Sequence, residues 1–267
     1  MNKFWWIILP LLILGGLWYR SLPKTLPKTA QVKNINILNE KGPYEVKTQK
    51  VKYYELVEGF LATPEKAGAY PGVVMIHEWW GLNENIRDMA RSLASFGYSV
   101  LAVDLYNGTV AKTPEEAKKQ IGSLDQEKAL LNMRAAADYL RKNEGTVKIA
   151  SLGWCFGGGQ SLKFSLSGEK LDATVIYYGD LLLEEKKLRP ITWPVFGVFG
   201  DKDTAVPVES ARIFDNVLTQ LNTPHEIHIY PGVGHAFANP SGDNYAPNET
   251  LDAWTKTVKF LEKNLKK

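Results

Sequence analysis

The segment VKIASLGWCFGGGQSLKF, residues 147–164, decides the fold of this chain. Residues 147–152 are typical of a short buried strand, and residues 159–164 are typical of the start of a helix. Between them lies a Gly-x-Cys-x-Gly turn centred on Cys155, the only cysteine in 267 residues. A strand, this turn and a helix are the context of a nucleophile elbow, whose strained turn projects the central side chain and admits only very small neighbours. A buried structural cysteine is the alternative, but it leaves the glycines unexplained.

The rest of the chain alternates predicted strands and helices. Strands are expected at residues 44–49, 53–61, 73–76, 98–103, 147–152, 173–178, 195–199 and 226–230. Helices are expected at residues 85–96, from 113 onward, and at 124–143, 159–166, 207–221 and 250–264. The first two strands form an antiparallel pair, and the later alternation implies an α/β fold with a mostly parallel central sheet and helices on both faces. One core domain, residues 34–267, accounts for all of these elements.

Composition excludes several classes of protein and site. The chain is 45% hydrophobic and 23% charged, which is ordinary for a folded domain. A single cysteine excludes an intrachain disulfide and a cysteine-rich zinc site, and neither a metal nor an organic cofactor is indicated. The net charge is +3, but residues 1–33 carry five basic residues and no acid, so the remainder carries −2. A domain that is not basic is a poor partner for nucleic acid.

The N-terminus carries a charge-free apolar run from Phe4 to Tyr19, flanked by Lys3 and Arg20. As a helix it would reach about 24 Å, slightly less than the roughly 30 Å of a hydrocarbon core. Aromatic residues lie at both of its ends, where membrane interfaces favour them. We therefore expect residues 1–20 to form a hydrophobic helix that anchors the chain in a membrane as an uncleaved signal anchor.

Two alternatives to the anchor stay open. A cleaved signal would give a secreted or periplasmic protein, although a good small-x-small cleavage site is lacking. The other alternative is that residues 4–19 form a buried helix of the core. Residues 21–33 repeat Leu-Pro-Lys-Thr at 22–25 and 26–29, and their prolines favour an extended linker. If residues 1–20 are an uncleaved anchor, we expect an extracytoplasmic catalytic domain tethered to the membrane.

Three chemically competent side chains follow three predicted strands. Cys155 follows residues 147–152, Asp203 follows residues 195–199, and His235 lies in a glycine-rich loop after residues 226–230. Sites in open α/β sheets form outside the carboxyl ends of the strands, and nucleophile, acid, histidine is the chain order of α/β-hydrolases. The histidine can accept the thiol proton and later protonate the leaving group, while the acid holds the imidazole in the correct tautomer.

Other residues compete for these roles. Asp201 lies two residues before Asp203, and we prefer Asp203 because it leads directly into the next helix. His77 is another possible base, but it is placed early in the chain. His225 and His228 belong to a strand, and we expect both to be structural.

Three segments give the chain a family resemblance. They are VMIHEWWGLN at residues 74–83, GWCFGG at residues 153–158 and GHAF at residues 234–237. With these segments, residues 50–267 resemble the dienelactone hydrolase family in order and spacing. The resemblance implies an α/β-hydrolase fold and a triad of Cys155, His235 and Asp203.

The resemblance also implies roles for residues around the triad. Glu78 would contact the resting thiol and help to gate its activation, and the backbone N–H groups of Trp79 and Phe156 would form the oxyanion hole. The expected substrate pocket contains Trp80, Tyr178, Phe237 and Asn239.

One position departs from the family pattern. Members that hydrolyse dienelactone have an arginine four residues after the catalytic histidine, where it binds the substrate carboxylate. This chain has Asn239 there, and asparagine lacks the charge and the bidentate geometry of arginine. A neutral ester or lactone is therefore as plausible a substrate as a dienelactone.

The sequence predicts a monomeric hydrolase that cleaves a small ester or lactone through a cysteinyl acyl-enzyme. The alternatives are a general carboxylesterase or thioesterase with the same triad, and a catalytically silent, membrane-tethered binding module.

Overall fold

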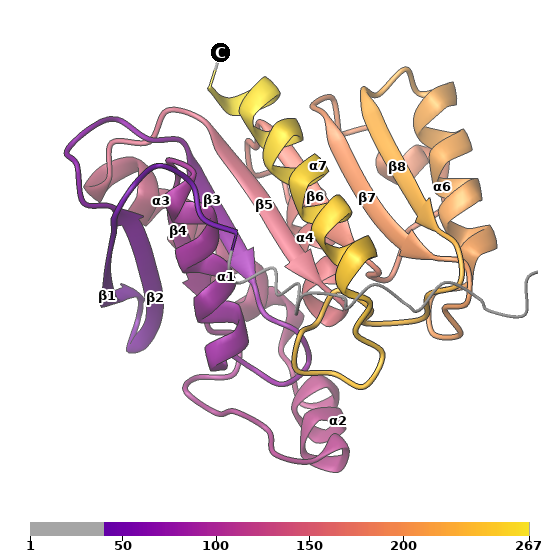
Figure 1. Ribbon diagram of the computed structural model, residues 1–267, viewed down its shortest axis with the longest axis horizontal. Helices are drawn as coiled ribbons and strands as arrows, with labels where there is room; N and C mark the ends of the chain where they lie inside the picture. The colour runs from indigo at the N-terminus through magenta and orange to yellow at the C-terminus, as the bar shows by residue number, and fades with distance from the viewer. Residues whose placement is uncertain (1–39, 267) are drawn as a thin grey trace, which may run out of the picture. The chain divides into compact units, whose positions relative to one another are not determined.

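The computed structural model describes residues 40–266, and within them one mixed sheet runs in the order β1-β2-β4-β3-β5-β6-β7-β8 (Figure 1). The strands are β1 Val46–Tyr54, β2 Val57–Pro64, β3 Gly72–Ile76, β4 Ser99–Val103, β5 Ile149–Trp154, β6 Ala173–Tyr177, β7 Val195–Gly200 and β8 His225–Tyr230. β1 and β2 pair antiparallel, β2 is antiparallel to β4, and β3 to β8 are all parallel. The prediction of a mostly parallel sheet that begins with an antiparallel pair is confirmed.

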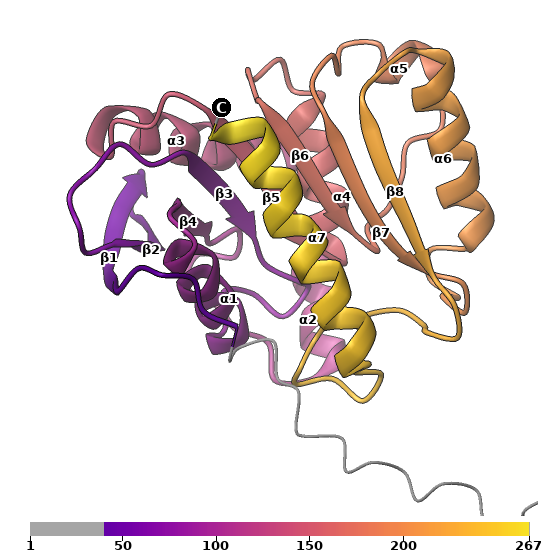
Figure 2. The ribbon, with the colours of Figure 1, turned by 45° about the horizontal axis from the view of Figure 1, so that its top comes forward.

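Helices cover both faces of the sheet, as predicted. They are α1 Glu84–Ser95, α2 Pro114–Gly122, α3 Gln126–Asn143, α4 Phe156–Ser165, α5 Glu185–Leu188, α6 Val208–Gln220 and α7 Pro247–Leu265. The sequence did not predict the single-turn helix α5. Figures 1 and 2 show α1 and α7 on one face, with α3, α4 and α6 on the other.

The alternation of side chains along the strands explains the two layers. In β3, Val73 and Met75 pack with residues of α1 and α7 in one core cluster. Val74 and Ile76 point to the opposite face, where they pack with residues of α3 and α4. Because all five residues of β3 are buried, the strand is apolar without interruption, as is typical of a central parallel strand.

Capping residues define the helices near the carboxyl end of the sheet. The Asn83 side chain accepts a hydrogen bond from the Ile86 N–H at the start of α1, and Thr113 does the same for Glu116 in α2. Pro114 occupies the first position of α2, where its missing N–H costs no helical hydrogen bond. Figure 1 shows α2 beyond the carboxyl ends of the parallel strands, the edge where a site is expected.

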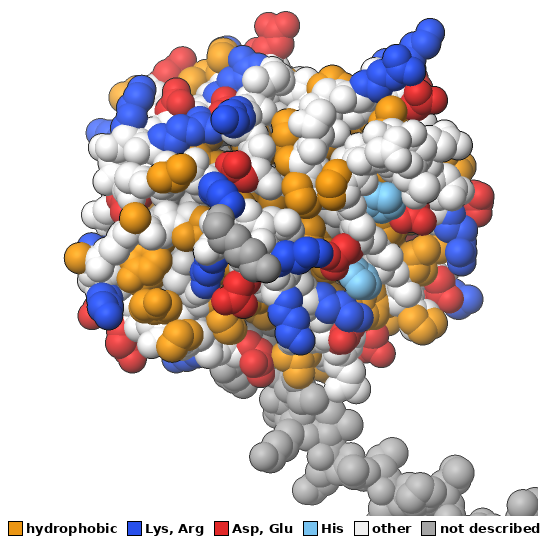
Figure 3. All heavy atoms as spheres, turned by 90° about the horizontal axis from the view of Figure 1, so that it is seen from above, with side chains coloured by type: hydrophobic (Ala, Val, Ile, Leu, Met, Phe, Trp, Pro, Cys, Tyr) orange, Lys and Arg blue, Asp and Glu red, His pale blue; other side chains and the backbone are white. Residues whose placement is uncertain are grey.

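The opposite edge of the sheet carries a mixed surface. Figure 3 shows acidic and basic side chains interspersed there with apolar ones.

The predicted anchor and linker, residues 1–33, lie outside the described residues. None of the helices within residues 40–266 is long and apolar enough to cross a bilayer.

Candidate active site

The turn between β5 and α4 has the geometry of a nucleophile elbow. Cys155 has φ 53° and ψ −120°, a backbone conformation that non-glycine residues rarely adopt. A Cβ at Gly153 would lie 2.1 Å from the Gly157 carbonyl oxygen, and a Cβ at Gly157 would lie 2.4 Å from the carbonyl oxygen of Ile76. The two glycines are therefore required, because the start of α4 passes directly over β5 and the end of β3.

The structure brings the three predicted side chains together. His235 Nε2 lies 3.0 Å from Cys155 Sγ, and His235 Nδ1 lies 2.8 Å from Asp203 Oδ2. The other carboxylate oxygen of Asp203 accepts hydrogen bonds from the N–H groups of Ala205 and Val206, each at 2.8 Å. The loop after β7 thus holds the acid rigidly, and the acid holds the imidazole toward the sulfur.

The competing residues have other partners. Asp201 Oδ1 accepts a hydrogen bond from the Gly232 N–H at 2.7 Å, so its carboxylate ties the loops after β7 and β8 together. His77 is fully buried, with Nδ1 2.6 Å from the Glu78 carbonyl oxygen and Nε2 3.1 Å from the Leu105 N–H. Burial lowers the pKa of His77, so its ring is neutral. Its two nitrogens are hydrogen-bonded to the local backbone.

The electrostatics of the three residues favour a charged imidazole. Burial works to lower the pKa of His235, but its hydrogen bonds to Asp203 and Cys155 outweigh burial and raise that pKa to about 10. Burial likewise works to raise the pKa of Asp203, yet His235 and the two backbone donors lower it. The acid is therefore ionised at neutral pH and stabilises an imidazolium beside the sulfur.

Two residues whose backbone amides were expected to form the oxyanion hole line the same cleft. Phe156 is the first residue of α4, so its N–H has no acceptor within the helix and lies at the positive end of the helix dipole. Trp79 lies in the turn after β3. Within residues 40–266 neither amide donates to a carbonyl group, and both residues line the cleft beside Cys155. The expected oxyanion hole at these two amides stays a prediction.

Glu78 is buried beside this centre, with 2% of its surface exposed. Its Oε2 accepts a hydrogen bond from Asn239 Nδ2 at 2.6 Å. Burial raises the pKa of Glu78 to about 7, against an opposing effect of His235. The expected contact was with the thiol, whereas the hydrogen bond observed for this carboxyl goes to Asn239 and that of the thiol goes to His235. The gating role stays a prediction.

A cleft of about 270 Å³ opens over Cys155 and His235. One wall is aromatic, with Trp79, Phe156 and Tyr178. The α2–α3 region contributes Ile121 and Leu124 to the lining. The polar residues of the lining are Gln126, Gln160, Lys163 and Asp180, with the two glutamine amides paired at 2.8 Å.

The four residues of the predicted pocket have different surroundings in the structure. Tyr178 lines the cleft, and its ring makes an edge contact with His235 at 5.3 Å. Phe237 is fully buried in the core, and Asn239 is engaged with Glu78. Trp80 is not among the residues that line the cleft, but its ring packs against that of Trp79 with centroids 4.9 Å apart. The left-handed turn at Ala236, φ 59°, directs the chain after His235 back into the core.

Sequence reasoning missed the residues that α2 and α3 contribute to the cleft. Ile121, Leu124 and Gln126 belong to no motif, and they lie about thirty residues from the elbow. The sequence signal that could have located this part of the lining was Ile121, an apolar residue near the end of a mostly polar helix. In the structure 39% of its surface is exposed. Within the described part of the chain, no group of three or more His, Cys, Asp or Glu residues is arranged to hold a metal ion.

Known proteins resemble this chain over most of its length. The model of the dienelactone hydrolase family matches residues 57–265. Protein usf of Aquifex pyrophilus is 31% identical over 219 residues, covering 78% of this chain and 94% of the relative. A Saccharolobus solfataricus protein, named provisionally as a carboxymethylenebutenolidase, is 29% identical over 246 residues with the same coverage.

A solved structure shows a similar fold. It is a dienelactone hydrolase-like promiscuous phosphotriesterase from metagenomic libraries, with a TM-score of 0.75 and 25% identity. The match covers 82% of this chain and 98% of that one. The residues that the family model matches, 57–265, include Cys155, Asp203 and His235.

Proposed function

This chain belongs to the dienelactone hydrolase family and is a hydrolase of ester or lactone bonds, and we propose that it acts through Cys155, His235 and Asp203 by way of a cysteinyl acyl-enzyme. The observation that carries the proposal is the continuous line of hydrogen bonds from Asp203 through His235 to the sulfur, with separations of 2.8 and 3.0 Å. A base within this distance of a nucleophile, itself oriented by a third group, is the arrangement that nucleophilic catalysis needs.

In the first half of the reaction, the proton of the Cys155 thiol passes to His235 Nε2, and the raised pKa of His235 favours the resulting thiolate–imidazolium pair. The sulfur attacks the carbonyl carbon of the ester, and the C=O electron pair moves to oxygen. The N–H groups of Trp79 and Phe156 stabilise that oxyanion. Collapse of the intermediate breaks the C–O bond, the imidazolium of His235 protonates the departing alkoxide, and a thioester remains on Cys155.

In the second half, His235 accepts a proton from water, and the hydroxide formed attacks the thioester carbonyl. The same two amides stabilise the second oxyanion. The C–S bond then breaks, the sulfur recovers its proton from His235, and the carboxylic acid leaves. Asp203 stays ionised throughout and stabilises the imidazolium of both halves, as its lowered pKa supports.

We propose neutral esters or lactones as the substrate class. The side chain four residues after the histidine is Asn239, which carries no charge and is occupied with Glu78. The charged residues of the cleft, Lys163 and Asp180, offset each other, and the remaining walls are mainly aromatic and apolar. A small apolar acyl group matches a cleft of about 270 Å³ better than a dicarboxylate does.

Chemical modification and substitution test the mechanism. Because Cys155 is the only cysteine, iodoacetamide should attach once and abolish hydrolysis of an aryl ester. Cys155→Ala should be inactive, and Cys155→Ser should retain weak activity at most. A burst of released phenol, with a hydroxylamine-sensitive acyl adduct on Cys155, identifies the thioester. Full activity in the alanine variant contradicts the proposal.

A substrate panel tests the substrate class separately. It compares neutral lactones, aryl esters and thioesters with carboxylated counterparts of the same size. We expect kcat/KM to favour the neutral member of each pair. Preference for thioesters would identify the enzyme as a general thioesterase with the same triad.

We further propose that residues 1–20 anchor the enzyme in a membrane with its catalytic domain outside the cytoplasm. The charge-free run from Phe4 to Tyr19 and its flanking aromatic residues support this location. The full-length chain should then sediment with membranes and resist extraction by salt or alkali, and deletion of residues 1–30 should release active enzyme. A mature protein that begins near Leu17 and is found in the soluble fraction would show a cleaved signal instead.

A further inference from the structure

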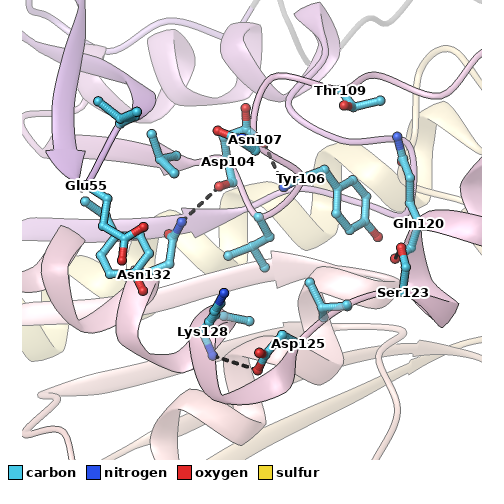
Figure 4. Close-up of a pocket in the computed structure, with 16 residues that line it drawn as sticks. Glu55, Asp104, Tyr106, Asn107, Thr109, Gln120, Ser123, Asp125, Lys128 and Asn132 are labelled. Carbon is cyan, nitrogen blue, oxygen red and sulfur yellow. Dashed lines mark hydrogen bonds between the residues drawn. The ribbon is translucent and has the colours of Figure 1, made fainter.

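A second and larger cavity lies beside the cleft. It has a volume of about 490 Å³, is open to solvent, and is lined by the turn between β1 and β2, the loop after β4, the end of α2 and the start of α3 (Figure 4). Leu124 is the one residue common to the linings of the cavity and the cleft. The cavity is therefore a separate site that adjoins the catalytic centre, within the 300–1,000 Å³ usual for small-molecule sites.

The floor of this cavity is held by a closed set of hydrogen bonds. The Tyr53 hydroxyl donates to Asn132 Oδ1 at 2.6 Å and accepts from the Asp104 N–H at 3.0 Å. Asn132 Nδ2 donates to the Asp104 carbonyl oxygen at 3.0 Å. The Asp104 carboxylate accepts from the N–H groups of Tyr106 and Gly108. These bonds form without a ligand, so the floor is already shaped for one.

The wall formed by Tyr106 and α2 contains buried polar groups without hydrogen-bond partners among the described residues. Both amide atoms of Gln120 and the hydroxyl of Tyr106 are buried, and within the described residues none of them has a hydrogen-bond partner. Tyr106 is 9% exposed, and Figure 4 shows the two side chains on the same side of the cavity. A buried polar group without a partner destabilises the fold by about 1–3 kcal/mol. A ligand able both to donate and to accept hydrogen bonds would relieve that cost.

The charges around the cavity select against anions. Glu55, Asp104 and Asp125 line it, and Lys128 is the single basic residue in its lining. Apolar surface is present as well, since Leu56, which is 83% exposed, lies at the rim. The cavity thus combines acceptors, donors and an apolar face under a net negative charge.

We propose that this cavity binds a neutral polyhydroxylated molecule of the sugar class. A hydroxyl group both donates and accepts, so adjacent hydroxyls can pair with the donor and acceptor of the Gln120 amide and with the Tyr106 hydroxyl. The C–H face of a sugar ring suits the apolar rim, and a neutral ligand avoids the repulsion that the carboxylates impose on an anion. The ligand would lie against α2, whose neighbouring residue Ile121 lines the catalytic cleft.

Ligand-observed saturation-transfer NMR on the full-length chain tests the proposal. The probes are methyl glucoside, methyl galactoside and methyl mannoside, with methyl glucuronoside as the anionic counterpart. We expect at least one neutral glycoside to bind and the glucuronoside to bind more weakly than methyl glucoside. Gln120→Leu and Tyr106→Phe should each weaken binding about three- to tenfold, since each removes one set of hydrogen bonds.

Matched controls separate the cavity from the cleft. Gln220→Leu makes the same change on the exposed surface of α6 and should leave binding unchanged. Alkylation of Cys155 with iodoacetamide places a carbamidomethyl group in the cleft and should also leave glycoside binding unchanged, whatever its effect on hydrolysis. Hydrolysis of a small aryl ester by Gln120→Leu should match that of the parent chain, which shows that the variant folds.

Four outcomes would overturn the proposal. They are the absence of binding by all three neutral glycosides at tens of millimolar, equal or tighter binding of the glucuronoside, unchanged binding in both Gln120→Leu and Tyr106→Phe, and loss of binding on alkylation of Cys155. The last outcome would place the sugar in the catalytic cleft. None of these outcomes depends on whether the hydrolytic mechanism proposed above is correct.

Discussion

Asn239 Nδ2 lies 2.6 Å from Glu78 Oε2, although 161 positions separate the two residues in the chain. The amide is oriented by Ser241, whose N–H and hydroxyl both donate to Asn239 Oδ1 at 2.9 and 2.7 Å. With its oxygen occupied, Asn239 can only donate toward Glu78. A neutral donor therefore holds the buried carboxyl next to the catalytic centre, where an arginine would have supplied a full positive charge.

Substitution of Glu78 by glutamine should change how stability depends on pH. The pKa of Glu78 is raised from 4.5 to about 7, so its contribution to stability is complete below pH 4.5 and is lost as pH rises toward 7. Glu78→Gln keeps the shape and cannot ionise. Urea unfolding should show the variant gaining on the parent chain as pH rises from 4.5 through 7 by up to about 3 kcal/mol, with the difference constant from about one pH unit above 7. A difference that does not vary with pH would show that Glu78 ionises freely.

Removal of the Asn239 amide should affect the charged form of Glu78 most. Asn239→Ala leaves a buried carboxylate without its donor, which raises the pKa of Glu78 further. The variant should lose about 1–3 kcal/mol of stability at pH 8 and less at pH 5, where Glu78 is protonated. Ser241→Ala is the milder control, because it removes one of the two bonds that orient the amide. Equal losses at both pH values would assign Asn239 a purely structural role.

Substitution of the orienting acid should reduce turnover strongly. Asp203→Asn removes the charge that orients and stabilises the His235 ring, and it should lower kcat for an aryl ester on the order of 10²–10⁴-fold. Asp201→Asn keeps a side-chain oxygen that can accept from the Gly232 N–H and should lower kcat much less. Steady-state kinetics of both variants with one substrate show which of the two carboxylates orients His235. The opposite ranking would make Asp201 the orienting residue.

The same acid should stabilise the fold over a defined pH window. The pKa of His235 is raised from 6.5 to about 10, so its stabilising effect is complete below pH 6.5 and is lost as pH rises through 10. The pKa of Asp203 is lowered from 3.8, so its effect is present above pH 3.8 and is lost in acid. Thermal unfolding should therefore show Asp203→Asn least stable relative to the parent chain near pH 5–6. A deficit that is largest at pH 10 would contradict this assignment.

Alanine at the elbow and alanine at the end of α2 should act in opposite directions. A Cβ at Gly157 would meet two backbone carbonyl oxygens, those of Ile76 at 2.4 Å and His77 at 2.5 Å, so Gly157→Ala should displace α4 and destabilise the fold by several kcal/mol, beyond the roughly 1–3 kcal/mol usual for overpacking. Gly122 has open space around its Cα, and Gly122→Ala should stabilise the protein by about 0.5–1 kcal/mol. Chemical denaturation of both variants measures the contrast, and a neutral Gly157→Ala would refute the close-approach argument.

The sequence by itself determined the elbow, the layered fold and the order of the chemically competent residues. Each depends on local signals: glycines beside Cys155, apolar runs that form central strands, and polar residues placed directly after those runs. Parallel strands bring their carboxyl ends to one edge, so Asp203 and His235 could be expected near Cys155 before any contact was known. The preference for Asp203 over Asp201 also followed from its position before a helix.

Only the tertiary structure decided what surrounds that centre. In the folded protein Phe237 is buried in the core and Asn239 donates a hydrogen bond to Glu78. Ile121 and Leu124, from the α2–α3 region, line the cleft. It also left the Gln120 amide and the Tyr106 hydroxyl without partners in a second cavity. These relationships depend on loop paths and on contacts between distant segments, which no local pattern encodes. The residue proposed as the nucleophile can thus be identified from local sequence, while the shape and charge of the surrounding cleft arise from packing.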